Sequence, residues 1–341
     1  MRIGLNGSGD GKPIERSARR IEALTRIRLR GLSTPRSISL ASLFHCELAQ
    51  ILFFYSTREC VMKASMHPPK LIASQPELDK FLEYICDAKH LAVDSESNSY
   101  FAYRPRVCLI QISRNHEDFI LDPLALEDIS PLGRIFADPS IEKVLHAAEN
   151  DLIGFKKDFR FQMQNVFDTS VACRLLGRSK LGLARILAEE FGVKLDKKYQ
   201  RCNWEKRPLS PEQIYYAQLD THLLIDLRNR LHGELLKKNL LSLAQKEYAR
   251  LEQIRLTPPR KWDPDGYLRL NGAQELPKPS LRVLKELSAY RERLARSTNK
   301  APFRVMNNEF MVRVAREMPG NLASLLQVRG LPSRFKGKGA G

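Results

Sequence analysis

The sequence lacks the features that mark membrane, secreted and metal-thiolate proteins. No apolar run reaches the roughly 20 residues that a helix needs to cross a bilayer. No two cysteines stand in the C-x-x-C spacing typical of zinc or redox sites. Glycine and proline are not in excess, and 43% of the 341 residues are hydrophobic, so the chain is not disordered throughout. We expect a soluble, cytoplasmic protein with free thiols and two or three domains.

Acidic residues are scarce at both ends of the chain but not in its middle. Residues 1–65 hold 11 Lys and Arg against 5 Asp and Glu, residues 66–240 hold 25 against 25, and residues 241–341 hold 20 against 9. The whole formal net charge of +17 therefore lies in the two flanks, which is typical of chains that bind a polyanion. The neutral middle keeps enough carboxylates to hold a cation.

The first 65 residues differ from the rest of the chain. They begin with a loop-like stretch, become rich in arginine and end in a short apolar run. We expect residues 1–65 to be a poorly ordered or extra N-terminal extension, with Met66 as a possible true start. An arginine-rich, acid-poor start is also found in organellar targeting peptides.

Residues 66–240 show the pattern of a mixed α/β (α+β) domain. Ser74 and Glu77 stand in capping-box spacing ahead of a helical run over 78–88. Short β-like runs then cover 90–96, 107–113, 118–122, 142–147 and 165–168, with helices expected around 131–137 and 149–157. After these runs the pattern is helical only, and one long helical run covers 211–238. Consecutive strands followed by helices predict a mixed β-sheet covered by helices.

The last third of the chain predicts a separate small helical unit. Residues 241–275 are expected to form a connecting helix and a linker, which contains the Pro- and Trp-bearing stretch TPPRKWDPDGY. From residue 276 to 341, short amphipathic helical patterns alternate with turn residues. We therefore expect a basic all-α domain over 276–341.

Three acidic features stand out in the middle domain. Asp94 and Glu96 lie at i and i+2 of a strand, so their side chains leave on one face, where two charges are tolerable mainly around a cation. Asp151 falls in the first turn of a helix that follows a strand. Tyr216 and Asp220, at i and i+4, share one helical face. Each feature has a structural alternative: a strand running into a polar loop, an acid favoured by the helix dipole, and a tyrosine packed over a surface acid.

Together these residues resemble the motifs of a known family. The order Asp94-x-Glu96, then Asp151 within KVLHAAENDL, then Tyr216-x-x-x-Asp220 is similar to the three exonuclease motifs of the DEDD 3'-5' exonucleases, tyrosine subclass. The segments AVDSESNSY, RVCLIQIS, VFDTSVACRLLG and YQRCNWEKRPLSPEQIYYAQLD resemble ribonuclease D. Residues 276–341 resemble the HRDC domain that follows the nuclease domain in that family, and they stop where such a domain usually continues into one more helix.

The resemblance implies a fold and a site. The fold would be a ribonuclease H-like mixed sheet covered by helices. The site would hold two divalent metal ions, Mg²⁺ or Mn²⁺, which stabilise charge on the attacking and the leaving oxygen of a phosphodiester. Asp94, Glu96 and Asp220 would bind one ion, Asp94 would bridge to the second, and Asp151 would support that second site. Tyr216 would orient the attacking water.

Other residues receive weaker assignments. We expect a structural role for Asp168, a satisfied buried position for His146 and a surface position for Glu205. For nucleic-acid binding, aromatic rings could stack terminal bases and basic side chains could contact phosphates, although the rings could equally be packing residues. These candidates are Tyr100, Phe101, Tyr103, Arg282, Lys285, Arg291, Arg293 and Arg296.

The resemblance predicts a metal-dependent 3'-5' exoribonuclease that releases mononucleotides from RNA 3' ends, with tRNA precursors as substrates in tRNA 3' maturation. Two alternatives remain open: a 3'-5' DNA exonuclease, because the motifs do not themselves read the 2'-hydroxyl, and an inactive nucleic-acid-binding adaptor. We expect RNA as the partner, a monomer, no small-molecule cofactor and no membrane association.

Overall fold

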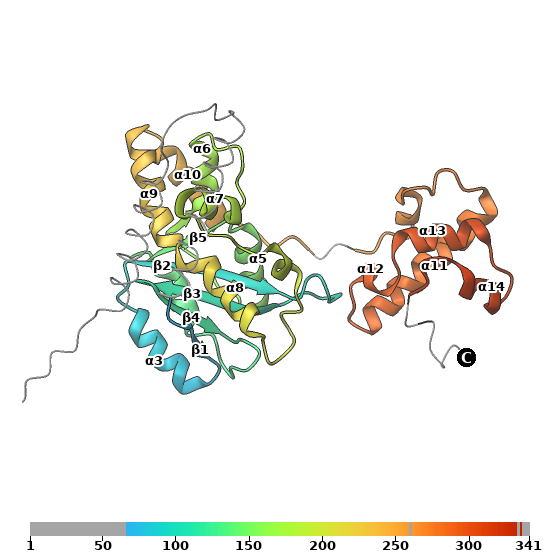
Figure 1. The fold of residues 1–341 in the computed structure, drawn as a ribbon, viewed down its shortest axis with the longest axis horizontal. Coiled ribbons are helices and arrows are strands. Elements are labelled where there is room, and N and C mark those ends of the chain that lie inside the picture. The colour runs from blue at the N-terminus through green and yellow to red at the C-terminus, as the bar shows by residue number, and fades with distance from the viewer. Residues whose placement is uncertain (1–65, 259–260, 333–334, 336–341) are drawn as a thin grey trace, which may run out of the picture. The chain divides into compact units, whose positions relative to one another are not determined.

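The computed structural model describes residues 66–258, 261–332 and 335. The predictions for residues 1–65 lie outside this range. Among the described residues, a mixed sheet with helices on both faces is followed by a small helical domain, as the sequence predicts (Figure 1). The strands are β1 (Lys70–Ile72), β2 (His90–Ser97), β3 (Val107–Arg114), β4 (Glu117–Leu121), β5 (Glu142–Leu145) and β6 (Val166–Asp168).

The sheet has the strand order β1-β4-β3-β2-β5-β6. Strands β2, β3 and β4 form an antiparallel meander, while β1 pairs parallel to β4, β5 to β2 and β6 to β5. Because β2 and β5 are parallel, their carboxyl ends meet at one edge of the sheet, where ligands of open α/β sheets commonly bind. The two strands pair only from His90 to Ala92 of β2, so the rest of β2 extends past β5.

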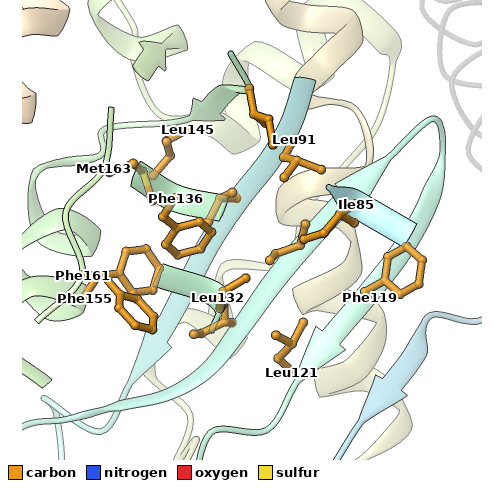
Figure 2. Close-up of a cluster of buried hydrophobic side chains, with 14 of the residues drawn as sticks. Ile85, Leu91, Phe119, Leu121, Leu132, Phe136, Leu145, Phe155, Phe161 and Met163 are labelled. Carbon is orange, nitrogen blue, oxygen red and sulfur yellow. The ribbon is translucent and has the colours of Figure 1, made fainter. Parts of the chain in front are cut away.

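One face of the sheet is covered by helices that flank the strands in sequence. These helices are α3 (Gln75–Ile85), α4 (Leu132–Ala137) and α5 (Glu149–Phe159). Their apolar side chains form a continuous core with Leu91, Ile112 and Phe119 of the strands (Figure 2). Phe136 of α4 and Phe155 of α5 stack at a centroid distance of 5.3 Å. This core fixes the start of α5, and therefore Asp151, against the sheet.

The opposite face is covered by helices from the second half of the domain. They are α6 (Thr169–Leu175), α7 (Leu183–Phe191), α8 (Pro211–His222), α9 (Leu224–Lys237) and α10 (Leu241–Glu252), with the short 3-10 helix η1 (Lys197–Arg201) before α8. Helix α8 packs on β2, β3 and β4, whereas α9 packs on β2, β5 and α6. Because α8 crosses the strand that carries Asp94 and Glu96, it brings a second acidic segment to the same place.

The C-terminal domain is helical and has its own core. It contains the 3-10 helix η2 (Gly266–Arg269) and helices α11 (Lys278–Ser297), α12 (Pro302–Val305), α13 (Asn308–Glu317) and α14 (Leu322–Gln327). Leu284 of α11 packs with Met311 and Ala315 of α13, and all three are fully buried. The absence of a further helix after α14 stays a prediction, because residues 336–341 lie outside the described part.

Two differences from the predicted elements concern the path of the chain. The long helical run over 211–238 is two helices, because Leu223 leaves the helical conformation (φ −105°, ψ 3°) and lets α8 and α9 follow different strands. Strand β1 was not predicted: three residues carry too little periodicity, and pairing with β4 creates the strand. Within the residues that the structure covers, no helix is both long and apolar enough to span a membrane.

Candidate active site

The site begins at the carboxyl end of β2. Asp94 and Glu96 leave the strand on the face that α8 covers, and both are half-buried. The pairing of β2 with β3 shifts register between Glu96 and Ser97, which ends the regular ladder immediately after the second carboxylate. The open edge of β2 beyond Ala92 leaves room for a third acid.

That third acid is Asp151 in the first turn of α5. The turn from β5 into α5 places Ala147 in the left-handed region (φ 57°), and the helix begins two residues later. Ser95, which points away from Asp94, donates a hydrogen bond of 2.5 Å from Oγ to Oδ1 of Asp151. Asp151 is buried, and this hydrogen bond joins the start of α5 to the strand that carries Asp94.

The fourth acid is supplied by α8. Ser210 caps the helix, its side chain accepts from the Gln213 backbone, and Pro211 opens the first turn. Asp220 lies two turns further along and is 6% exposed. Carboxylate oxygens of Asp94, Glu96 and Asp220 all lie within 4.8 Å of one another. The structure thus gathers three predicted residues in one cluster, with Asp151 held against the same strand.

The cluster is electrostatically unfavourable without a cation. Burial raises the pKa of Asp94 well above its usual value, and the charges of Asp151, Asp220 and Glu96 raise it further. The pKa of Glu96 is also raised, first by burial and then by Asp220 and Asp151. Burial is the main cause of the raised pKa of Asp151, about 6, and of Asp220, about 8. Hard divalent cations prefer such oxygen ligands, so the donor set fits Mg²⁺ or Mn²⁺.

Tyr216 lies one turn before Asp220 on the same face of α8. The interaction of its hydroxyl with the Asp220 carboxylate lowers the pKa of that acid against the effect of burial. The pKa of Tyr216 itself is raised far above its usual value by burial and by the negative charge of Asp220. The hydroxyl therefore keeps its proton at neutral pH in the metal-free protein, which suits a group that orients a water.

Asp168 has the buried structural position expected for it, whereas His146 has hydrogen-bond partners but is half-buried. Asp168 accepts from the backbone of Ser170 and Val171 as the cap of α6, and also from Ala147 and Ala148 at the turn into α5. His146 Nδ1 contacts the Thr169 hydroxyl and Nε2 contacts the Leu181 carbonyl oxygen, each at 2.8 Å. Both side chains are thus occupied in holding the turn that positions Asp151.

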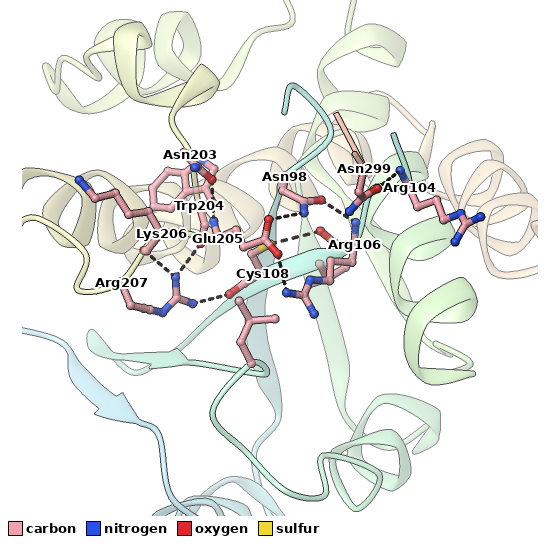
Figure 3. A network of polar contacts seen from close by, with 12 residues as sticks. Asn98, Arg104, Arg106, Cys108, Asn203, Trp204, Glu205, Lys206, Arg207 and Asn299 are labelled. Atoms are coloured by element: carbon pink, nitrogen blue, oxygen red, sulfur yellow. Dashed lines mark hydrogen bonds and ion pairs between the residues drawn. The ribbon is translucent and has the colours of Figure 1, made fainter. Parts of the chain in front are cut away.

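A polar network joins the end of β2 to the segment that leads into α8 (Figure 3). Glu205 accepts from the Asn98 amide at 3.0 Å and from the Arg106 guanidinium. The side chain of Glu205 is 37% exposed, so Glu205 is a surface charge that Asn98 and Arg106 hold in place. Arg207 donates two hydrogen bonds to Asp122, at 2.5 and 2.8 Å.

The predicted RNA-contacting aromatics lie in the loop after β2. Tyr100 is 38% exposed and packs edge to face on Phe101 at 5.7 Å. The guanidinium of Arg201, at the end of η1, lies 5.7 Å from the centre of the Tyr100 ring. Tyr103 is half-buried. Their contact with a nucleic acid stays a prediction.

The predicted basic residues of α11 occupy two faces of the helix. At 100° per residue, four exposed basic residues fall within one narrow face: Arg282, Lys285, Arg293 and Arg296. Arg291 falls on the opposite face and is half-buried, where it donates to the Met306 carbonyl oxygen and to Asn308 Oδ1. We call the first four residues the α11 basic stripe. Of these, Arg296 also pairs with Glu292 at 3.5 Å. Contact of the stripe with phosphates stays a prediction.

Two residues near the cluster were missed by sequence reasoning. Ser95 stands between the two predicted carboxylates but points to the other face, so strand alternation hid its contact with Asp151. Gln200 hydrogen-bonds the Tyr216 hydroxyl, and only the fold of η1 brings it there. The signal in the sequence was the segment YQRCNW, which matched the family pattern without an assigned role.

Comparisons with known proteins agree with this geometry. Residues 69–236 match the sequence model of the 3'-5' exonuclease domain, and residues 280–338 match that of the HRDC domain. The exosome complex component 10 homolog of Caenorhabditis elegans is 30% identical over 299 residues, which make up 82% of this chain and 33% of that protein. The chain thus spans about a third of the length of this curated relative.

Two solved structures cover most of the chain. The catalytic core of RRP6 from Trypanosoma brucei is 29% identical with a TM-score of 0.72, covering 80% of this chain and 77% of that one. RNase D of Escherichia coli, described as an exoribonuclease involved in structured RNA processing, is 31% identical with a TM-score of 0.56, covering 80% and 73%. The chain therefore belongs to the 3'-5' exonuclease family of RNase D and RRP6, with a nuclease domain followed by an HRDC domain.

Proposed function

We propose that this protein is a metal-dependent 3'-5' exoribonuclease that shortens structured RNA one nucleotide at a time. The observation that carries the proposal is the cluster of Asp94, Glu96 and Asp220 oxygens within 4.8 Å, with the Tyr216 hydroxyl on Asp220. Family membership supports a nuclease, and the description of Escherichia coli RNase D as an exoribonuclease involved in structured RNA processing supports RNA as the substrate.

The carboxylates would hold two divalent ions. Asp94, Glu96 and Asp220 would bind one ion, and Asp94 with Asp151 the other. When bound, such ions lower the pKa of water and stabilise charge on both the attacking and the leaving oxygen. The four acids also gain from the ions, because opposite charge offsets the effect of burial, and then of repulsion, that raises their pKa values.

The protein's own residues would then position the reactants. Asp220 and Gln200 would hold the protonated Tyr216 hydroxyl in place. The hydroxyl would then orient the attacking water toward the terminal phosphodiester. A bond forms between the water oxygen and phosphorus while the water releases a proton to solvent, the bond to the 3' oxygen of the preceding nucleotide breaks, and that oxygen takes up a proton from solvent. The products are a 5'-mononucleotide and an RNA shorter by one residue.

The substrate and cellular setting are further parts of the proposal. Precursors of tRNA are our first candidate, since the motifs resemble ribonuclease D, and a cytoplasmic location stays an expectation. Several relatives are named as exosome complex components. Assembly with other proteins is therefore an alternative to a monomer. Light scattering of the purified chain would decide whether it is a monomer by itself.

A degradation assay tests the activity. We would incubate the full chain with 5'-labelled single-stranded RNA, the same sequence as DNA, and a tRNA precursor, each with Mg²⁺, Mn²⁺ or EDTA. We expect a ladder that shortens from the 3' end only with a metal, and faster with RNA. Preference for DNA would support the DNA exonuclease instead. If no substrate is shortened with any metal, the protein would be interpreted as an inactive nucleic-acid-binding adaptor.

Asp94→Asn tests the site itself. Because Asp94 would contact both ions, we expect turnover to fall at least about a thousandfold, which corresponds to roughly 4 kcal/mol of transition-state stabilisation. RNA binding, measured by fluorescence anisotropy, should stay within about twofold. A variant that keeps wild-type turnover would contradict the metal assignment.

A further inference from the structure

One buried amide beside the carboxylate cluster has no partner. Gln111 lies in the middle of β3 and is 1% exposed. Neither its Oε1 nor its Nε2 atom makes a hydrogen bond within the described residues. Leaving a buried polar group unpaired destabilises the folded state, and native proteins rarely keep one without a use.

The strand register places this amide next to Asp94. Gln111 and Asp94 are direct partners across the antiparallel pair of β3 and β2. Side chains of such a pair leave on the same face, with Cβ atoms about 4.5–5.5 Å apart. On its other side Gln111 is paired with Ile120 of β4, which offers only an apolar side chain. An amide with two rotatable bonds beyond Cβ reaches a carboxylate at this distance.

Two neighbouring polar side chains on this face are already engaged. Ser113, two residues along β3, contacts Asp118 and Thr221 at 2.6 Å each. Gln218 of α8, equally buried, donates to Asp118 and to the His67 carbonyl oxygen at 2.7 Å each. The two buried glutamines therefore differ: the amide of Gln218 is satisfied by the fold alone, and that of Gln111 is not.

We propose that Gln111 is a positioning residue of the metal site: when the ions bind, rotation about its side-chain bonds would bring its Nε2–H, unpaired in this structure, to the Asp94 carboxylate as a donor. The proposal rests on the metal-dependent function proposed above. The hydrogen bond would fix which Asp94 oxygen faces each ion, and Oε1 would accept from a water in the site. A neutral amide does this without adding a fifth negative charge. Hydrogen bonds to metal ligands typically change metal affinity 10–100-fold.

Direct measurement of metal binding tests the proposal without RNA. We would titrate the full-length wild type, Gln111→Met and the matched control Gln218→Met with Mn²⁺, by calorimetry and by electron paramagnetic resonance. We expect Gln111→Met to raise the Mn²⁺ Kd about tenfold or more. Its metal-free melting temperature should be unchanged or higher, because methionine removes the unpaired amide while keeping its volume.

The control should show the opposite pattern. Gln218→Met removes two satisfied hydrogen bonds, so we expect a lower melting temperature and an Mn²⁺ Kd within about twofold of the wild type. Gln111→Asn keeps an amide on a side chain too short to reach Asp94, so it should weaken Mn²⁺ binding as Gln111→Met does. If Gln111→Met fails to fold, Gln111→Asn replaces it in the test.

Two results would overturn the inference. Wild-type Mn²⁺ affinity in both Gln111 variants would leave the amide without a role at the site. Weakened binding in step with lost stability, in the Gln218 variant too, would make the effect structural. A wild type that binds Mn²⁺ but does not degrade RNA would refute the proposed function alone, whereas a wild type that binds no Mn²⁺ would refute both.

Discussion

At the residue scale, the site is a set of acids that the fold holds too close together. Asp94, Glu96, Asp151 and Asp220 all have raised pKa values, with burial as the first cause and mutual repulsion next for most of them. In an isolated strand or helix each would ionise near pH 4. The difference between those states makes the stability of the metal-free protein depend on pH.

The direction of this dependence follows from the shifts. A carboxyl with a higher pKa in the folded state holds its proton more tightly there, so its stabilising effect is full below about pH 4 and is lost as pH rises through the folded pKa. For Asp151 and Asp220 the folded values are about 6 and about 8. We expect the melting temperature in EDTA to fall as the pH rises from 5 to 8. In Asp220→Asn this fall should be smaller than in the wild type.

Thermal unfolding of both proteins across this range measures the effect. Added Mn²⁺ should reverse the trend, because the ions bind the ionised acids and their affinity grows with pH. Parallel pH profiles for wild type and Asp220→Asn in EDTA would show that Asp220 does not carry the raised pKa.

Tyr216→Phe separates orientation from metal binding. Loss of the hydroxyl removes a hydrogen bond to Asp220 and the group that would orient the water. We expect kcat to fall about 10–100-fold, or roughly 1.4–2.7 kcal/mol, with the Mn²⁺ Kd within about threefold. Single-turnover kinetics and calorimetry give the two numbers. Equal losses in both would make Tyr216 a support for the metal site instead of a positioning group for water.

At the element scale, the position of α8 decides whether the site forms. Arg207 lies shortly before the N-terminus of α8. Its guanidinium donates hydrogen bonds to Asp122, which follows β4, and to the Cys108 carbonyl oxygen of β3. Further along, His222 contacts Asp118 of β4 at 2.7 Å. Polar contacts at both ends therefore fix α8 along the strands, and they set where Asp220 lies.

Arg207→Ala tests this anchoring. Asp122 is 6% exposed and would be left without its charged partner, so we expect a loss of about 3 kcal/mol in the free energy of unfolding and weaker Mn²⁺ binding. Urea unfolding measures the first effect. The matched control is Arg185→Ala, which breaks the exposed pair with Glu189 and should cost about 0.5 kcal/mol or less. Equal losses in the two variants would contradict an anchoring role for Arg207.

At the scale of the whole molecule, charge is divided between the two domains. Residues 66–240 carry as many acidic as basic residues, while residues 241–341 carry 20 basic against 9 acidic. A nuclease domain with an acidic site gains little from long-range attraction of RNA. We propose that the basic excess of the helical domain, with the α11 basic stripe exposed on one face, supplies that attraction.

Removing part of the α11 basic stripe should weaken the salt dependence of RNA binding. We expect Arg282→Gln with Lys285→Gln to reduce the slope of log K against log salt by about 1.4, that is about 0.7 for each lost contact with single-stranded RNA. Fluorescence anisotropy from 50 to 300 mM salt measures the slope. The control pair Lys237→Gln with Lys238→Gln removes two exposed charges from α9, and an equal change there would leave no special role for the stripe.

The sequence by itself determined the fold class, the order of the major elements and the identity of the clustered acids. Hydrophobic periodicity and capping residues are local signals, so the main strands and helices could be predicted from them, and the spacing of Asp94, Glu96, Tyr216 and Asp220 already resembled one family. Short β1 and the break at Leu223 could not be predicted, because pairing and packing partners far along the chain create them.

Only the tertiary structure decided how the acids meet and what supports them. The register between β2 and β3 places Gln111 opposite Asp94, strand alternation sends Ser95 toward Asp151, and the fold of η1 brings Gln200 to the Tyr216 hydroxyl. Spacing along the chain does not reveal these pairs, since each joins residues of two different elements that only the fold brings together. The physical reason is that pKa values and hydrogen bonds depend on distances in space, which strand pairing and helix packing set.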